Sequence, residues 1–312
     1  MSDSVQFLTV AQDEAGQRLD NYLIRNLRKV PKSLIYRIIR KGEVRINKGR
    51  AKPERKLQEG DVVRVPPVRV GDVNEIPKVS TGLADVLTCA VVYESSKLII
   101  LNKPSGLAVH GGSGVNLGMV EALRQIRSDC HYLELVHRLD RDTSGCIMVA
   151  KKRSMLRELH ALLRAEGGID KRYLALVRGR WPSDLGRVDA PLRKNELLSG
   201  ERVVRVTSDG KPSVTQFSIV KRFQNATLVQ AKPLTGRTHQ IRVHALHAGH
   251  PIVGDDKYGD EELNKNMKHL GLKRLFLHAT SLAFKLENGE LIQAEAPLPN
   301  DLSRGLEKLV AL

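Results

Sequence analysis

The sequence predicts an α+β fold, in which a small basic module precedes a larger, strand-rich domain with a mainly antiparallel sheet. Short segments with the pattern of strands outnumber helical patterns after residue 86, and they do not alternate regularly with helices as a parallel sheet requires. The charge is also unevenly distributed. Residues 18–70 hold 16 Lys and Arg against 5 Asp and Glu, whereas the whole chain of 312 residues has a net charge of +16. At roughly 150 residues per domain, the length fits two domains.

The basic module is predicted to contain two helices followed by short strands. Apolar residues recur at helical spacing over 19–27 and over 34–39, and alternating residues predict strands at 44–46 and 62–65. Lys and Arg lie between the apolar positions, where they can contact phosphates. The candidates are Arg37, Arg40, Lys41, Arg45, Lys48 and Arg50. The alternative is that these cations only form the solvent-exposed face of an amphipathic helix. Their concentration in one short segment favours contact with RNA or DNA.

A linker is predicted over residues 67–85, because its Pro, Gly and Ser residues interrupt any regular pattern. The larger domain then covers residues 86–312. Its predicted strands lie at 98–102, 146–151, 173–178, 214–220 and 227–232, and its predicted helices at 120–127, 154–164 and 240–248.

Composition and motifs argue against several classes of protein. No apolar run reaches the roughly 18 residues of a membrane span, and the first thirty residues hold no signal-peptide core, so we expect no membrane association. Cys89, Cys130 and Cys146 lack CxxC spacing, which indicates reduced thiols and a cytoplasmic protein. No GxGxxG follows a strand, and the glycine-rich segment 111–114 lacks the Lys-Ser/Thr ending of a phosphate-binding loop. We therefore expect no cofactor.

The segment HRLDRDTSG, residues 137–145, is the first candidate for chemistry. It places two carboxylates, Asp140 and Asp142, among arginines. A neighbouring cation favours the ionised carboxylate, which can act as a nucleophile or a base. A turn with local ion pairs is the alternative. Residues 142–145 also look like one half of an aspartic-protease site, but a second such triplet is missing and a homodimer would be needed.

A second polar segment, residues 235–244, follows a predicted strand and opens a predicted helix. Its first residues can therefore meet a phosphate or a carboxylate, and Arg237 and His239 are candidates for RNA contact. Four histidines between residues 239 and 250 raise the alternative of a metal site. Their spacing is not HExxH and no acidic residue falls among them, so we expect no metal. Tyr173 opens a predicted strand after two basic residues, and by itself it fits a core position.

In combination, these segments resemble the pseudouridine synthases of the RluA family. The likeness is carried by LNKPSGLAVHGGSG at 101–114, HRLDRDTSG at 137–145, KRYLALVRG at 171–179 and GRTHQIRVHALHAGHPIVGDDKYG at 236–259. Residues 18–66 resemble the S4 RNA-binding domain. This resemblance implies a small S4-type domain followed by a catalytic domain, in which a mixed, mainly antiparallel sheet forms a central cleft.

The resemblance also implies roles for single residues. Asp140 corresponds to the catalytic aspartate, and Arg242 to the arginine that pairs with it. Tyr173 is expected against the uracil ring, Leu277 in the wall of the base pocket, and Arg138 in the RNA stack where the target base leaves. Uridine becomes pseudouridine without gain or loss of atoms, so the reaction needs no cofactor or metal. Asp140 can either attack the nucleoside or remove the C2′ proton, and both routes stay open.

The near full-length resemblance favours uridines of large-subunit (23S) ribosomal RNA as the substrate, free or in an assembly intermediate, and a monomeric enzyme. Transfer RNA and small-subunit ribosomal RNA are alternatives, because their synthases share the catalytic motifs. A non-catalytic RNA-binding or ribosome-assembly factor is the alternative from another class. It would share the basic module but would not need Asp140, Tyr173 and Arg242 to converge.

Overall fold

The computed structural model describes residues 4–27, 30–68, 77–111, 117–196 and 202–312. The chain divides into two compact units, Met1–Ile76 and Pro77–Leu312. The glycine-rich residues 112–114 and residues 69–76 of the predicted linker lie outside the described residues.

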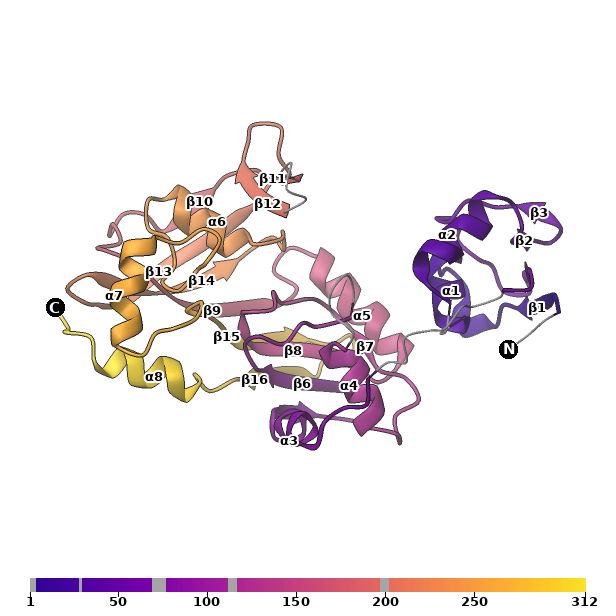
Figure 1. Ribbon diagram of the computed structural model, residues 1–312, viewed down its shortest axis with the longest axis horizontal. Coiled ribbons are helices and arrows are strands. Elements are labelled where there is room, and N and C mark those ends of the chain that lie inside the picture. Colours follow the sequence, from indigo (N-terminus) through magenta and orange to yellow (C-terminus); the bar gives the residue numbers. More distant parts are fainter. Residues whose placement is uncertain (1–3, 28–29, 69–76, 112–116, 197–201) are drawn as a thin grey trace. The chain divides into compact units, whose positions relative to one another are not determined.

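In its described residues, the smaller unit combines two α-helices with a four-stranded antiparallel sheet of strand order β1-β4-β2-β3. Figure 1 shows α1 and α2 beside β1, β2 and β3. Its elements are β1 (Gln6–Thr9), the 3₁₀ turn η1 (Gln12–Glu14), α1 (Leu19–Asn26), α2 (Lys32–Arg40), β2 (Arg45–Ile46), β3 (Gly49–Arg50) and β4 (Val62–Val65). Both predicted helical stripes are confirmed, because Leu19, Leu23, Ile35 and Ile39 are at most 2% exposed and share one core. Burial of these side chains is what joins the helices to the sheet.

The larger unit is built on one sheet with the strand order β10-β13-β14-β9-β15-β8-β6-β5, in which β16 pairs with β15 and β7 with β8. Among its strand pairs in the described chain, β15–β8 is parallel and the others are antiparallel. The strands are β5 (Val91–Glu94), β6 (Leu98–Lys103), β7 (Glu134–Leu135), β8 (Ser144–Ala150), β9 (Asp170–Arg178), β10 (Arg187–Asp189), β13 (Val214–Arg222), β14 (Ala226–Pro233), β15 (Leu277–Lys285) and β16 (Leu291–Glu295). The predicted α+β class and mainly antiparallel sheet are confirmed.

A separate hairpin and six helices complete the described part of this unit. The hairpin pairs β11 (Leu192–Glu196) with β12 (Arg202–Val206). The helices are α3 (Thr81–Cys89), α4 (Met119–Ile126), α5 (Arg153–Arg164), α6 (Gln240–His247), α7 (Glu261–His269) and α8 (Asn300–Glu307). All five predicted strands and all three predicted helices are present with small differences at their ends. No helix in the described part of the chain is long and apolar enough to cross a membrane.

Two apolar cores meet near the middle of the sheet. One includes residues of α3, α4, α5, β6 and β8, and the other includes residues of α6, α7, α8, β9 and β14. Trp181 anchors the second core at 1% exposure, with its ring 4.6 Å from that of Phe217. Tyr173 of β9 packs against both cores. A side chain at this junction can therefore be held rigidly.

The end of the predicted linker is helical, which corrects the prediction for residues 81–85. The sequence Ser80-Thr81-Gly82 suggested a break, but the Ser80 hydroxyl accepts a hydrogen bond from the Leu83 N–H at 3.3 Å and caps α3. Leu87 of this helix is fully buried in the first core. Residues 81–85 therefore belong to the larger unit.

Candidate active site

A cleft of about 390 Å³ in the larger unit brings together segments that are far apart in the sequence. It is lined by the loop before β8, the strands β9 and β15, and the segment that leads from β14 into α6. The lining includes seven of the residues that the sequence singled out: Arg138, Asp140, Tyr173, Arg237, His239, Arg242 and Leu277. The size is typical of a site for a small organic group.

Lys103, at the end of β6, holds the loop that carries Asp140 in place. The Lys103 ammonium is fully buried and donates hydrogen bonds to the carbonyls of Pro104, Leu107 and Arg141 at 2.8–2.9 Å. Burial lowers the pKa of Lys103 to about 7, although the nearby carboxylates of Asp142 and Asp140 act in the opposite direction. Lys103 was not among the residues predicted for the site. The one feature of the sequence that could have indicated it is a single charge at the end of an apolar strand.

Asp140 faces two nitrogen-bearing side chains of the segment that enters α6. Its Oδ2 lies 3.4 Å from Nη1 of Arg242, and its Oδ1 lies 3.8 Å from Nε2 of His239. The predicted proximity of Arg242 to Asp140 is therefore present. The Arg242 side chain is 9% exposed, so its charge acts on the carboxylate with little screening by water.

The closest partner of Arg242 is a second carboxylate, Asp255, that the sequence analysis did not single out for chemistry. Asp255 receives hydrogen bonds from Nε and Nη2 of Arg242 at 2.7 and 2.6 Å, and its side chain is 1% exposed. It also accepts the backbone N–H groups of Lys257 and Tyr258. A bidentate pair of this kind fixes the plane of the guanidinium, and this leaves Nη1 directed at Asp140.

Asp142 lies in a different environment from Asp140. Its side chain is 44% exposed, pairs with the neighbouring Arg141 at 3.1 Å, and does not line the cleft. Ser144, in the same protease-like triplet, is fully buried and its hydroxyl lies 2.9 Å from Nδ1 of His278. This geometry favours Asp140 over Asp142 as the reacting carboxylate and gives the protease interpretation no support.

Tyr173 and Leu277 form one wall of the cleft because of the register between β9 and β15. Leu277 lies opposite Ala175, and Ala279 lies opposite Tyr173, so all four side chains belong to the same face of the sheet. Leu277 is 4% exposed. Burial and the charge of Asp140 raise the pKa of Tyr173, so that its hydroxyl stays protonated at neutral pH. Arg138 is exposed at the cleft and makes no ion pair with a described residue.

The segment before α6 is shaped by Gln240, which, like Lys103 and Asp255, was not among the residues predicted for the site. Its side-chain oxygen accepts the Thr235 hydroxyl at 2.7 Å and the Arg237 N–H at 3.0 Å. Its amide nitrogen donates to the carbonyl of Val214. These bonds curl the segment, so that Arg237 is exposed at the cleft while His239 points inward at 17% exposure.

The histidines after this segment have structural partners. His244 is fully buried between the Thr215 hydroxyl at 2.9 Å and the Ala190 carbonyl at 3.0 Å. His250 lies 2.7 Å from the carbonyl of Arg178. Among the described residues, no three His, Cys, Asp or Glu side chains are placed to share a metal ion. The metal alternative thus gains no support from these histidines.

Comparison with known proteins identifies the family. Residues 97–247 match the family described as RNA pseudouridylate synthase, and residues 17–63 match the S4 domain. The chain is 59% identical over 312 residues to "Ribosomal large subunit pseudouridine synthase C" of Haemophilus influenzae, which covers 99% of this chain and 96% of that relative. This chain belongs to the RNA pseudouridine synthase family. The protein of the same name from Escherichia coli is 56% identical over 98% of this chain and 97% of its own length.

A solved structure also resembles the catalytic part of this pseudouridine synthase. "Human RNA Pseudouridylate Synthase Domain Containing 4" superposes with a TM-score of 0.60 at 28% identity, covering 72% of this chain and 95% of that chain. The predicted order of an S4 domain followed by a synthase domain is confirmed. The alternative of a non-catalytic RNA-binding factor is therefore set aside.

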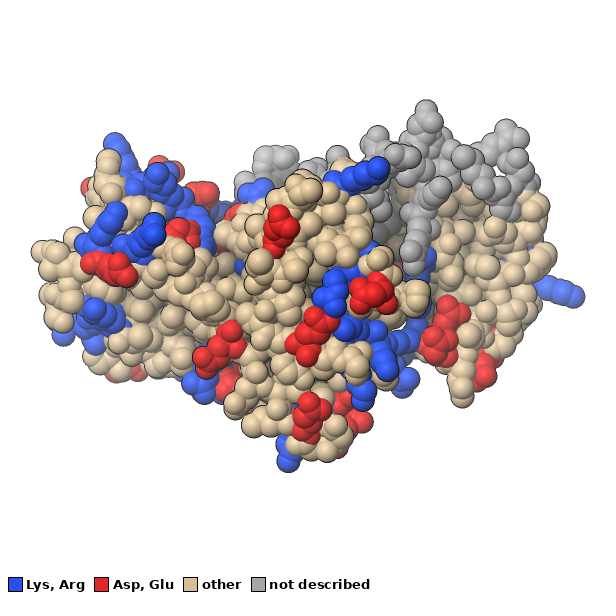
Figure 2. Space-filling view, turned by 90° about the horizontal axis from the view of Figure 1, so that it is seen from below, with Lys and Arg blue, Asp and Glu red and all other residues tan. Residues whose placement is uncertain are grey.

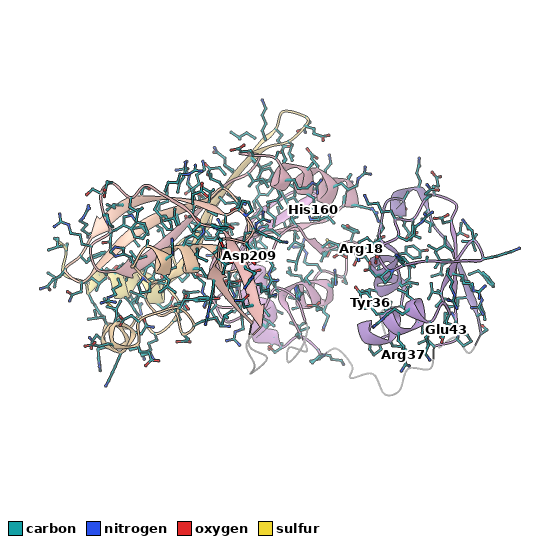
Figure 3. All side chains as sticks on the ribbon, turned by 90° about the horizontal axis from the view of Figure 1, so that it is seen from above. Arg18, Tyr36, Arg37, Glu43, His160 and Asp209 are labelled. Atoms are coloured by element: carbon teal, nitrogen blue, oxygen red, sulfur yellow. The ribbon has the colours of Figure 1, made fainter. Side chains whose placement is uncertain are left out.

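The S4 unit of the synthase exposes all six of its own cations that were predicted to contact RNA. They are Arg37 and Arg40 of α2, Lys41 after it, and Arg45, Lys48 and Arg50 of the β2–β3 hairpin. In the same unit, the buried Asp20 carboxylate accepts hydrogen bonds from the Arg18 guanidinium at 2.6 Å and from the Tyr36 hydroxyl at 3.1 Å. Figure 3 shows Arg18 and Tyr36 side by side. This contact ties α1 to α2 and holds the exposed face of α2 in place.

The larger unit carries its charges differently. Residues 77–312 hold 35 Lys and Arg against 25 Asp and Glu, a net charge of +10 over 236 residues, whereas residues 1–76 hold 16 against 10, a net charge of +6 over 76 residues. Figure 2 shows acidic and basic side chains interspersed on the face of this unit that it displays. Net positive charge is therefore denser in the smaller unit, while the larger unit carries more of it in total.

Proposed function

We propose that this enzyme converts specific uridines of large-subunit ribosomal RNA into pseudouridine, with Asp140 as the reacting carboxylate. The convergence of Asp140, Tyr173 and Arg242 on one cleft carries the proposal for the site. The relatives named for the ribosomal large subunit, which match over nearly their full length, support the choice of RNA.

The target nucleotide has to leave the RNA stack before it can reach the cleft. Extruding a base costs on the order of a few kcal/mol of stacking and pairing. Arg138, exposed at the cleft, can place its planar guanidinium in the space that the base leaves and offset part of this cost. The extruded uracil then lies against Tyr173 and Leu277, which share one face of the sheet.

The reaction exchanges one glycosidic bond for another. The N1–C1′ bond breaks, the uracil turns, C5 bonds to C1′, and the proton lost from C5 is balanced by one gained at N1. Asp140 either attacks C1′ and forms an ester, or removes the C2′ proton. Arg242 stabilises the negative charge of Asp140 and orients it. The extruded base, by filling the cleft, excludes the water that would otherwise trap the intermediate.

The two routes at Asp140 differ in which bond breaks. Removal of the C2′ proton predicts a primary isotope effect when the target uridine carries deuterium at C2′, measured under single-turnover conditions. Attack at C1′ predicts no such effect, because the C2′–H bond stays intact. Unlabelled RNA of the same sequence is the control.

We further propose a division of labour between the two units. Residues 18–66 dock on the ribosomal RNA, free or in an assembly intermediate, and the larger unit, residues 77–312, performs the chemistry, with residues 67–76 between them. The exposed cations of the S4 unit support the first role. One chain supplies every residue named for the site, which supports a monomer, and we place its action in the cytoplasm. Sedimentation of the purified enzyme with and without RNA tests whether the enzyme is a monomer.

The substrate is tested with RNA from cells that lack this protein. We expect the purified enzyme to introduce pseudouridine at discrete positions of the large-subunit RNA and at none in the small-subunit RNA or transfer RNA of the same cells. Modification confined to either of the other two RNAs would contradict the proposed substrate while leaving the enzymatic activity intact. A heat-inactivated sample of the enzyme provides the baseline for mapping.

A further inference from the structure

Tyr258 connects the active site to the β11–β12 hairpin. Its hydroxyl accepts the backbone N–H of Val204, in β12, at 2.9 Å and lies 2.8 Å from Nδ1 of His239. Nε2 of the same imidazole lies 3.8 Å from Oδ1 of Asp140. A continuous line of polar groups therefore runs from the hairpin backbone to the proposed reacting carboxylate.

The direction of these hydrogen bonds follows from the chemistry of the groups. A backbone N–H can only donate, so the Tyr258 oxygen is the acceptor for Val204. The proton of the Tyr258 hydroxyl is then free to be donated to Nδ1 of His239. A neutral imidazole that accepts at Nδ1 carries its proton on Nε2, the nitrogen that faces Asp140.

The surroundings hold both rings in this arrangement. Tyr258 is 8% exposed and packs in a small apolar cluster with Leu192, Val204 and Val243, which seats the hairpin on α6. The guanidinium carbon of Arg242 lies 5.0 Å from the centre of the Tyr258 ring. The ring therefore has little freedom to turn its hydroxyl away from His239.

The backbone of His239 shows a separate sign of constraint. This residue adopts the left-handed conformation, with φ of 54° and ψ of 19°, directly before α6. Residues other than glycine enter this region at an energetic cost and stay there when their surroundings require it. Here the conformation directs the imidazole between Tyr258 and Asp140.

We propose that Tyr258 is a positioning residue, which fixes His239 as the neutral tautomer with its proton on Nε2 and so presents an N–H donor to Asp140. The inference rests on the proposed role of Asp140. Arg242 then faces Oδ2 at 3.4 Å, while the His239 N–H faces Oδ1 at 3.8 Å, beyond hydrogen-bond distance, so that its dipole acts on the carboxylate electrostatically. The opposite tautomer would direct a lone pair at an anionic oxygen.

The charge state of the imidazole agrees with this assignment. Burial lowers the pKa of His239, and the cations Arg242 and Lys257 add to the effect, whereas Asp140 and Asp255 oppose it. A neutral donor orients the carboxylate without binding it as tightly as a second cation would. The carboxylate thus keeps its reactivity toward the nucleoside.

The tautomer can be observed directly in the full-length enzyme. Long-range ¹H–¹⁵N correlation spectra at pH 7.5, with His239→Asn used to assign the signals, are expected to show His239 protonated on Nε2 alone. Asparagine is the substitution of choice because it tolerates the left-handed backbone. A proton on Nδ1, or a doubly protonated ring, would overturn the proposal whatever the activity of the enzyme.

Tyr258→Phe removes the hydroxyl while it keeps the ring and its apolar contacts. We expect the spectrum of this variant to show a mixture of both tautomers, and the single-turnover rate to fall about tenfold or more at unchanged RNA affinity. Tyr93→Phe, in β5 of the other core, is the matched control and is expected to leave both readouts unchanged.

The outcomes separate this proposal from the proposed function. A lower rate without a change of tautomer, or a change of tautomer without a lower rate, would overturn the positioning role of Tyr258. If Tyr258→Phe does not fold, the wild-type spectrum still decides the tautomer. A wild-type enzyme that modifies no large-subunit RNA would contradict the proposed substrate and leave the tautomer result standing.

Discussion

Asp255 is expected to stabilise the catalytic unit and to orient Arg242, and Asp255→Asn tests both roles. Its side chain is 1% exposed and receives two hydrogen bonds of 2.6 and 2.7 Å from Arg242. Removing one partner of a buried ion pair costs about 3–5 kcal/mol. Because asparagine keeps one accepting oxygen, we expect a loss near the lower end, about 3 kcal/mol.

That loss can be measured as a shift of the melting temperature. For a domain of 150–250 residues, about 1 kcal/mol corresponds to roughly 2–4 °C, so Asp255→Asn is expected to melt about 6–12 °C lower than the wild type. Asp140 then becomes the one carboxylate near Arg242 among the described residues, and a shift of the guanidinium toward it should slow the single-turnover reaction. Calorimetry and rapid-quench assays of the same samples give both values.

Asp301→Asn is the matched control, because Arg274 and Asp301 form a similar bidentate pair of 2.6 and 3.1 Å at the surface. The Asp301 side chain is 50% exposed, so water screens the pair and its loss should cost about 0–1 kcal/mol. Equal losses in the two variants would refute the argument from burial. A loss below about 1 kcal/mol for Asp255→Asn would do so as well.

Three further predictions concern RNA and pH. Arg138→Ala should slow modification of structured RNA more than of an unstructured oligonucleotide, and equal effects on both would contradict its place in the stack. Removal of residues 1–76 should weaken RNA binding and flatten its dependence on salt, while pseudouridine formation persists on RNA supplied at high concentration; an unchanged salt slope would contradict the docking role of the S4 unit. Arg127, with help from Lys151, lowers the pKa of Glu94 to about 2 from 4.5. The Glu94 carboxylate therefore contributes its full share of stability above about pH 5 and loses it as the pH falls toward 2. Over that range, the free energies of unfolding in urea of wild type and Glu94→Gln should converge.

The periodicity of apolar residues was enough to predict the elements that bury one clear face. The stripe at 34–39 became α2, and the apolar run at 98–102 became β6, whose first four residues are at most 1% exposed. Helix α7 was missed because it offers only Leu263 and Met267 as apolar residues. It is stabilised by its ends, where the Asp260 carboxylate accepts the N–H of Leu263 at 2.8 Å.

The candidate site was predictable where a motif resembled a family and unpredictable where a residue acts through its contacts. Asp140 and Arg242 were placed by resemblance, and the structure brings them to 3.4 Å. Asp255 and Tyr258 lay within a quoted motif, but no spacing rule connects them to a helix that begins at Gln240, 15 and 18 residues earlier. Lys103 was missed for the same reason, because it binds a carbonyl 38 residues away.

The most direct test of the account compares Asp140→Asn with Asp142→Asn in pseudouridine formation. Both substitutions remove one charge from the same loop, but Asp140 lines the cleft whereas Asp142 is 44% exposed beside Arg141. We expect Asp140→Asn to fold, bind RNA and form no pseudouridine, and Asp142→Asn to retain most of the wild-type rate. An active Asp140→Asn with an inactive Asp142→Asn would contradict the assignment of the reacting carboxylate.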